Sequence, residues 1–216
     1  MSCAICLQRK EKRFCPAIHG RICPQCCGEQ RELTLDCPSD CPYLQQARQH
    51  EGLRELHHLP AEEVFPKVQI SDEFLDRREP LIEGILHAIG NLSRQDRSMN
   101  DREVIAALTT MTQSYQILAG SGLVYEQASP SLAQQAITET LRRLLQDYRQ
   151  VEQEHLGRSS LTDGEALKAL VFTLRLALTH TSGRPRSRRF LDFLRETFPA
   201  SPGGPTATPS SRIFMP

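Results

Sequence analysis

All eight cysteines of this 216-residue chain lie within its first 41 residues. They fall into close pairs that include one histidine: Cys3 with Cys6, Cys15 with His19, Cys23 with Cys26 (followed directly by Cys27), and Cys37 with Cys41. Zinc in proteins takes four thiolate or imidazole ligands, and a two-residue spacing supplies two of them from one turn. The segment is poor in large apolar residues, so bound metal is expected to hold it folded. The spacing therefore predicts a zinc-binding module at residues 1–41 with two structural zinc ions.

The segment offers nine candidate ligands for the eight coordination positions of two zinc ions. Two ways of dividing the ligands between the ions, here called partitions, are open. In the sequential partition, each ion takes its ligands from one half of the segment: Cys3, Cys6, Cys15 and His19 for the first ion, and Cys23, Cys26, Cys37 and Cys41 for the second. Each half contains Cys-x2-Cys followed by Cys-Pro and a fourth ligand, which favours this reading. Cys15-Pro16 and Cys37-Pro38 are then predicted to begin helices, because proline suits the first helical position.

In the interleaved partition, the pairs alternate between the ions: Cys3, Cys6, Cys23 and Cys26 hold one, and Cys15, His19, Cys37 and Cys41 hold the other. Over residues 3–41 this order resembles the RING finger family, with Ile5 inside the first pair and Pro38 after Cys37. The resemblance implies a cross-braced fold and ubiquitin-ligase activity. The last pair is separated by three residues where RING fingers have two, and the chain contains no tryptophan.

Cys27 leaves a further alternative open in both partitions. If all eight cysteines are ligands, two all-thiolate sites result and His19 is not used. If His19 is a ligand, one cysteine is spare, and Cys27 can replace Cys26. The segment from Cys23 to Gly28 resembles a zinc knuckle of treble-clef or zinc-ribbon type, for which 31–36 is expected to supply a short strand. Four protein ligands leave no position for water, which indicates structural rather than catalytic zinc.

The rest of the chain is predicted to be helical, which gives a mainly α fold. We expect a connector helix and linker at 42–70 and an all-α bundle of five to six helices at 71–199, since apolar residues recur there at helical spacing. Pro80 is expected either to divide or to kink one helix. The tail 200–216 is rich in proline, serine, threonine and glycine, and is predicted to be disordered.

Two capping-box patterns mark helix starts within the predicted bundle. They are Asn100 with Glu103 and Thr162 with Glu165, each followed by an apolar run. The helix after Thr162 is apolar on most sides, which is typical of a central helix. A short final helix is predicted at 188–198.

No signal peptide is expected from the first residues, and the longest apolar stretch, 166–178, is too short to cross a bilayer. We expect a soluble, intracellular, cytoplasmic protein without membrane contact, where reducing conditions keep thiols available for metal.

Composition and motifs reduce the number of function classes that fit this chain. The 26 basic and 26 acidic residues give zero net charge, without the basic excess typical of nucleic-acid binding. The cluster Arg9–Arg13 and the arginines at 184–189 are both expected in exposed loops. The chain has no nucleophile elbow and no phosphate-binding loop. We predict a non-enzymatic zinc-finger protein that serves as a protein-interaction or regulatory module. The alternatives are nucleic-acid binding through Arg9–Arg13 and a RING-like ubiquitin ligase.

Overall fold

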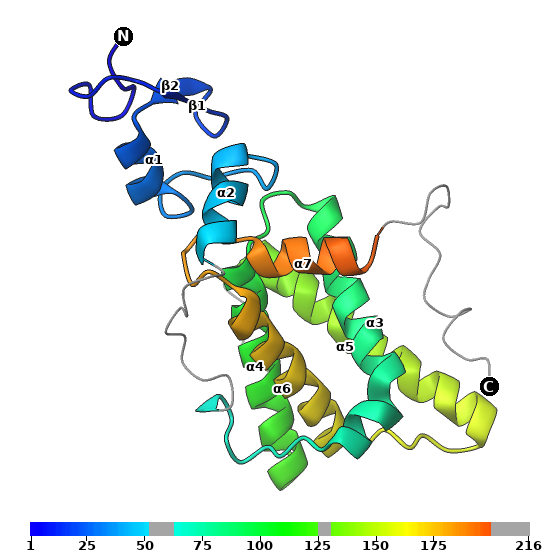
Figure 1. Cartoon of the computed structure of the whole chain (residues 1–216). Coiled ribbons are helices and arrows are strands. Elements are labelled where there is room, and N and C mark those ends of the chain that lie inside the picture. The colour runs from blue at the N-terminus through cyan, green and yellow to red at the C-terminus, as the bar shows by residue number, and fades with distance from the viewer. Residues whose placement is uncertain (52–62, 125–130, 200–216) are drawn as a thin grey trace.

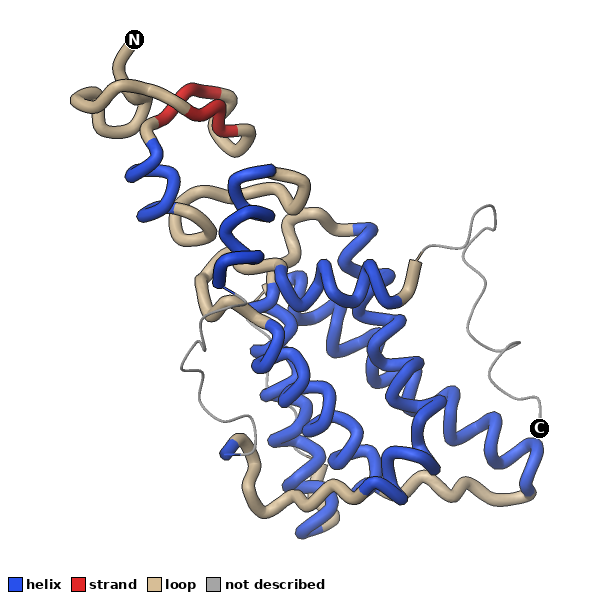
Figure 2. The backbone as a smooth tube through the Cα atoms, in the orientation of Figure 1, coloured by secondary structure: helices blue, strands red, loops and turns tan. Residues whose placement is uncertain are grey.

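The computed structural model describes residues 1–51, 63–124 and 131–199. Within these ranges the chain forms seven helices and a single two-stranded sheet, which confirms the mainly α fold class (Figures 1 and 2). The cysteine-rich segment projects from one end of the helical bundle (Figure 1). The predicted boundaries at residues 41, 70 and 199 stay predictions, and the tail 200–216 lies outside the described residues.

The N-terminal segment is built on a hairpin and two helices. Strands β1 (Arg13–Cys15) and β2 (Gly20–Ile22) pair antiparallel, with Cys15 opposite Gly20. Helices α1 (Pro24–Gln30) and α2 (Pro42–Glu51) follow. Both begin with proline directly after a cysteine, which agrees with the preference of proline for the first helical position.

The helix starts predicted at Cys15-Pro16 and Cys37-Pro38 are wrong. Residues 16–19 form the turn of the hairpin, and the amide of Cys41 bonds the carbonyl of Pro38 at 3.0 Å across a second turn. Proline presets the backbone for a turn as readily as for a helix, so Cys-Pro alone does not distinguish them. The strand expected at 31–36 is instead a turn closed by one bridge between Arg31 and Leu35.

Five helices form the bundle, as predicted: α3 (Asp72–Gln95), α4 (Asp101–Ser121), α5 (Leu132–Leu156), α6 (Asp163–His180) and α7 (Arg189–Thr197). Helix α4 packs on α5 and α6, and α3 packs on α5 and α7. The short α7 lies across the end of the bundle nearest the cysteine-rich segment (Figure 1). Helix α3 continues through Pro80 as one helix. None of the helices in the described ranges is long and apolar enough to span a bilayer.

The two predicted capping boxes have different outcomes. At Thr162 the box is complete, because the side chains of Thr162 and Glu165 each accept the other's backbone amide. At Asn100 only half of it forms. The Asn100 side chain accepts the amide of Glu103, but the carboxylate of Glu103 accepts a hydrogen bond from Ser131 at 2.7 Å. That carboxylate therefore links the start of α4 to the start of α5.

The core of the bundle is apolar and continuous. Its fully buried large side chains come from all five helices and include Leu81, Leu108, Leu141, Leu170 and Phe190. Helix α6 contributes buried alanines between larger residues and contacts α3, α4 and α7. Helices α3 and α4 each contact three helices as well, so the central position of α6 stays a prediction.

One buried arginine is held inside this bundle by two glutamates. Arg78 on α3 donates to Glu152 and Glu165, each at 2.7 Å, and to Ser160 at 2.9 Å. Burial raises the pKa of Glu152, but hydrogen bonds from Ser160 and Arg78 outweigh it and lower the pKa to about 2. This ion pair joins α3, α5 and α6 across the core, and an unpaired charge there would be costly.

Polar contacts also fix the cysteine-rich segment on the bundle. Glu32, which is 2% exposed, accepts from Arg48 on α2 at 3.0 Å and from Ser182 at 3.1 Å. The other end of the Arg48 guanidinium donates to Asp192 on α7 at 2.7 Å. Asp192 also accepts from Ser39 at 2.7 Å. These contacts hold the cysteine-rich segment against α7.

The arginine-rich loop at 184–189 completes this junction. Arg184 donates to the carbonyl of Arg31 at 2.6 Å, and Arg188, which is buried, pairs with Asp36 at 2.9 Å. The expectation that this loop is solvent-exposed is therefore wrong for these two side chains. They bond backbone and carboxylate oxygens of the cysteine-rich segment.

Candidate metal centre

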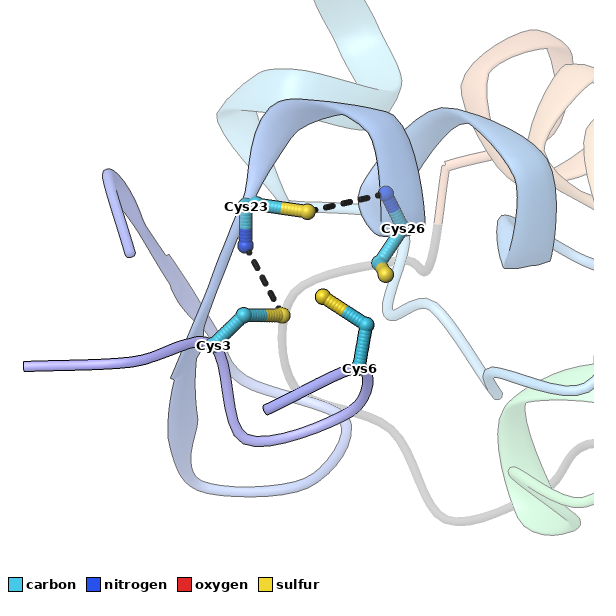
Figure 3. A group of neighbouring side chains, drawn as sticks. All are labelled: Cys3, Cys6, Cys23 and Cys26. Atoms are coloured by element: carbon cyan, nitrogen blue, oxygen red, sulfur yellow. Dashed lines mark hydrogen bonds between the residues drawn. The ribbon is translucent and has the colours of Figure 1, made fainter. Parts of the chain in front are cut away.

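Four cysteine sulfurs converge at the N-terminal end of the molecule. The Sγ atoms of Cys3, Cys6, Cys23 and Cys26 all lie within 4.8 Å of one another and point toward a common centre (Figure 3). In a tetrahedral site with Zn–S bonds of about 2.3 Å, sulfurs are about 3.8 Å apart, so the group needs only a small contraction to close on zinc. Across the described ranges no other group of three or more candidate ligand atoms comes this close together.

Two local structures position these sulfurs. Cys3 and Cys6 lie on a turn in which the amide of Leu7 bonds the carbonyl of Cys3 at 2.8 Å. The hairpin returns the chain, and the amide of Ala4 bonds the carbonyl of Arg21 at 3.0 Å, which sets this turn beside the end of β2. Cys23 comes two residues later, at the start of α1.

Backbone amides also bond the sulfurs directly. The amide of Cys23 donates to Cys3 Sγ at 3.2 Å, and the amide of Cys26 donates to Cys23 Sγ at 3.4 Å (Figure 3). Hydrogen bonds to a sulfur favour its thiolate form, which is the form that binds metal. Amides of Arg9 and Gln8 likewise lower the pKa of Cys6 to about 6. Burial and the hydrogen bond with Cys23 raise the pKa of Cys26 to about 12, which favours its neutral thiol. A metal cation among the four sulfurs would favour the thiolate form instead.

Arg9 supplies positive charge next to this group. Its guanidinium donates to Cys26 Sγ at 3.7 Å and to the Gln25 side chain. A zinc ion with four thiolates carries a net charge of −2, which a neighbouring guanidinium offsets. The sequence placed Arg9 only in a basic cluster. Its position three residues after Cys6 is the signal that could have identified this role.

The group that forms is the first set of the interleaved partition. The sequential partition would have joined Cys3 and Cys6 to Cys15 and His19, and the structure keeps them apart. His19 is exposed at the tip of the hairpin, where its φ of 49° is left-handed. Cys15 is buried at the end of β1.

The other four cysteines line one small cavity, which none of the first four cysteines lines. Cys15, Cys27, Cys37 and Cys41 are buried together with Leu35 and Leu44. Burial raises the pKa of Cys37, although a hydrogen bond from the Glu32 backbone partly opposes it. All eight cysteines lie in the described part of the chain, and all are free thiols.

The basic cluster Arg9–Arg13 is divided among separate roles. Arg9 contacts the sulfur group, and the guanidinium of Arg13 lies 4.6 Å from the centre of the Tyr43 ring. Lys10 and Lys12 are exposed. Nucleic-acid binding through this cluster stays a prediction. Comparison with protein-family models, curated proteins and solved structures gave no match, so the geometry alone supports the reading of a zinc-finger-like module.

Proposed function

We propose that this protein is a non-enzymatic interaction module. In it, structural zinc folds the cysteine-rich segment together with α2, which we call the finger, and the finger packs against the helical bundle. Four cysteine thiols close the first site, which leaves no position for a substrate or an activated water. The order of knuckle, hairpin and helix supports a treble-clef type of finger. We propose a zinc content of two ions per chain, both bound by cysteines of this finger.

The observation that carries this proposal is a groove at the junction of finger and bundle. It encloses about 750 Å³ and is lined from the finger by Asp36 and Asp40, and from the bundle by Arg94, Arg97, Arg188 and Arg195. Because one wall of the groove comes from the finger and the other from the bundle, the groove keeps its shape only if the two parts are held rigidly against each other. The buried contacts of Glu32 and Arg48 provide that rigidity.

The charge of this groove favours an acidic partner. Arg188 pairs with Asp36 and Arg195 pairs with Asp192. Arg94 instead donates to three uncharged oxygens, on the side chain of Asn91 and on the backbone of Arg195 and Phe198. Arg97 is exposed beside it. The positive charge of these two arginines is therefore suited to carboxylates of a partner protein, because arginine binds carboxylates in bidentate geometry.

A binding measurement with defined probes tests this. The probes are a fluorescent ten-residue glutamate peptide and a single-stranded RNA of ten nucleotides. We expect the peptide to bind, and the double variant R94E/R97E to weaken that binding at least tenfold. The control R102E/R158E makes the same charge change at exposed arginines outside the groove and should leave binding unchanged. Equal loss in both variants, tighter binding of RNA, or no binding of the peptide would contradict the proposal.

A RING-like ubiquitin ligase is the second candidate, because the first sulfur group follows the interleaved order of that family. Ile5 lies between two of its cysteines and is half-buried against the finger core. An autoubiquitination assay with purified activating and conjugating enzymes tests this candidate. Ubiquitin chains formed by the wild type and lost in I5A would support it, and no chains with a panel of conjugating enzymes would remove it.

A further inference from the structure

We propose that Cys15, Cys27, Cys37 and Cys41 form a second tetrathiolate site, which binds one divalent ion of the zinc class. This inference deepens the proposed function and rests on the finger being a zinc-folded structure. It replaces His19 by Cys27 as the fourth ligand, and it gives all eight cysteines a role.

The four thiols share one enclosed space. Cys15, Cys27, Cys37 and Cys41 are each 6–8% exposed, and all line the same cavity of about 10 Å³. That volume is about one water-sized sphere, enough for a single atom-sized guest. The remaining walls are mainly apolar and include Leu35, Leu44 and Phe14. Such a dry surrounding protects metal–sulfur bonds from water.

Helix α1 explains how adjacent cysteines serve different sites. Successive residues on an α-helix point about 100° apart, so Cys26 and Cys27 face different sides. Cys26 belongs to the first sulfur group, and Cys27 lines the second cavity. The hairpin also divides its cysteines, because Cys15 at the end of β1 lines the second cavity and Cys23 after β2 belongs to the first group. The two sites are therefore interleaved along the chain, and α1 supplies a cysteine to each of them.

The remaining pair comes from one turn. Cys37 and Cys41 flank the turn in which the Cys41 amide bonds the Pro38 carbonyl, and Cys41 directly precedes α2. Three residues between the two cysteines suit two ligands of one ion. Side-chain rotation must then draw the four sulfurs from their present spacing to about 3.8 Å.

Four buried arginine Nε atoms in the described residues have no hydrogen-bond partner, and one of them lies at this cavity. Arg31 lines the same cavity, and within the described residues its Nε is buried without a hydrogen-bond partner. Buried donors normally have an acceptor. A metal-bound thiolate would supply one, as Cys26 does for Arg9 in the first group. Each tetrathiolate site, with net charge −2, would thus have its own arginine.

A second ion would also stabilise the part of the finger that the first sulfur group does not hold together. The first group ties together residues 3–26. The turns at 31–41 and the start of α2 lie beyond it, and their large, fully or nearly buried apolar side chains are only Leu35 and Leu44. Apart from the polar contacts of Glu32, Asp36 and Ser39 with the bundle, so small a core contributes little to the folding of a segment of this length. Metal binding free energy would supply the difference.

Zinc content of the full chain, purified without chelator, tests the inference by elemental analysis. We expect two zinc ions per chain in the wild type and in H19A, and one in each of C26S, C27S and C41S. The double variant C26S/C27S should contain none. Cobalt titration gives an independent measure, because the thiolate-to-cobalt absorption band should saturate at two equivalents in the wild type and at one in C27S.

The outcomes separate the two proposals. One zinc ion in the wild type that is lost in C26S and retained in C27S and C41S would overturn the second site and leave the first. Loss of one ion in H19A and not in C27S would make histidine the ligand and overturn the assignment. No metal in the wild type would overturn both the second site and the zinc-folded finger. Even if a cysteine variant fails to fold, the cobalt stoichiometry of the wild type decides whether a second site exists, and H19A decides whether histidine is its ligand.

Discussion

The finger and the bundle bury different chemistry, although they belong to one chain. Ten residues form the buried cluster of the finger; seven are cysteines, and only Ile22, Leu35 and Leu44 are large apolar residues. The buried cluster of the bundle contains 23 residues, none of which is cysteine. A short segment cannot bury enough apolar surface to offset its conformational entropy, whereas five packed helices can. The finger is therefore expected to depend on metal, and the bundle on packing.

Removal of metal should have the largest effect, because it should unfold one region and leave the other folded. We expect an excess of chelator to unfold the finger and to leave α3–α7 folded, because structural zinc contributes about 10–16 kcal/mol to folding. Amide NMR spectra would show collapse of the finger resonances alone, with helical circular dichroism largely kept. Loss of both sets of resonances together would mean that the bundle also depends on metal.

A cavity introduced into the bundle should have the opposite effect, because it should destabilise the bundle and leave the zinc of the finger in place. Leu141 is fully buried, so L141A should lower the free energy of unfolding by about 2–5 kcal/mol without changing zinc content. The matched control is L132A on the same helix, where the side chain is 82% exposed and the change should be near zero. Denaturant unfolding and elemental analysis measure the two quantities. Zinc loss in L141A would contradict the separation.

Acid should act on the bundle through Glu152. Its folded pKa of about 2 lies below the ordinary 4.5, so its stabilisation is complete above about pH 4.5 and is lost as the pH falls toward 2. The fall corresponds to on the order of 3 kcal/mol.

The measurement for Glu152 is the difference in unfolding free energy between the wild type and E152Q as a function of pH. This difference should be largest near neutral pH and should shrink below pH 4.5. The control E154Q changes an exposed glutamate two residues away and should match the wild type throughout. A pH-independent difference would assign the effect to packing and not to charge.

The smallest expected effect concerns the junction between the two regions. R48M removes the guanidinium that bridges Glu32 and Asp192 and should cost about 2 kcal/mol, less than a fully buried ion pair because Arg48 is partly exposed. We expect thermal unfolding to change from one transition to two. R143M, at an exposed ion pair on α5, is the control. An unchanged single transition in R48M would show that other contacts couple the regions.

Several features could be predicted because they depend on neighbours a few residues apart. The density and spacing of cysteines indicated a metal-binding segment, and the periodic apolar residues with the box at Thr162 indicated the helices. Cys-Pro was ambiguous at this range, since the same dipeptide begins helices at Cys23 and Cys41 and turns at Cys15 and Cys37.

Spacing by itself thus determined that the chain has a thiol-rich finger and a helical bundle. Only the tertiary structure decided which thiols meet, because the hairpin brings Cys23 back to Cys3, and local spacing does not encode that return. It also decided that Arg184 and Arg188 face the finger, and that Arg78 meets Glu152 from 74 residues away. The physical reason is the range of each interaction. Turn and helix geometry is set within about four residues, whereas metal groups and buried ion pairs form only where packing brings distant segments together.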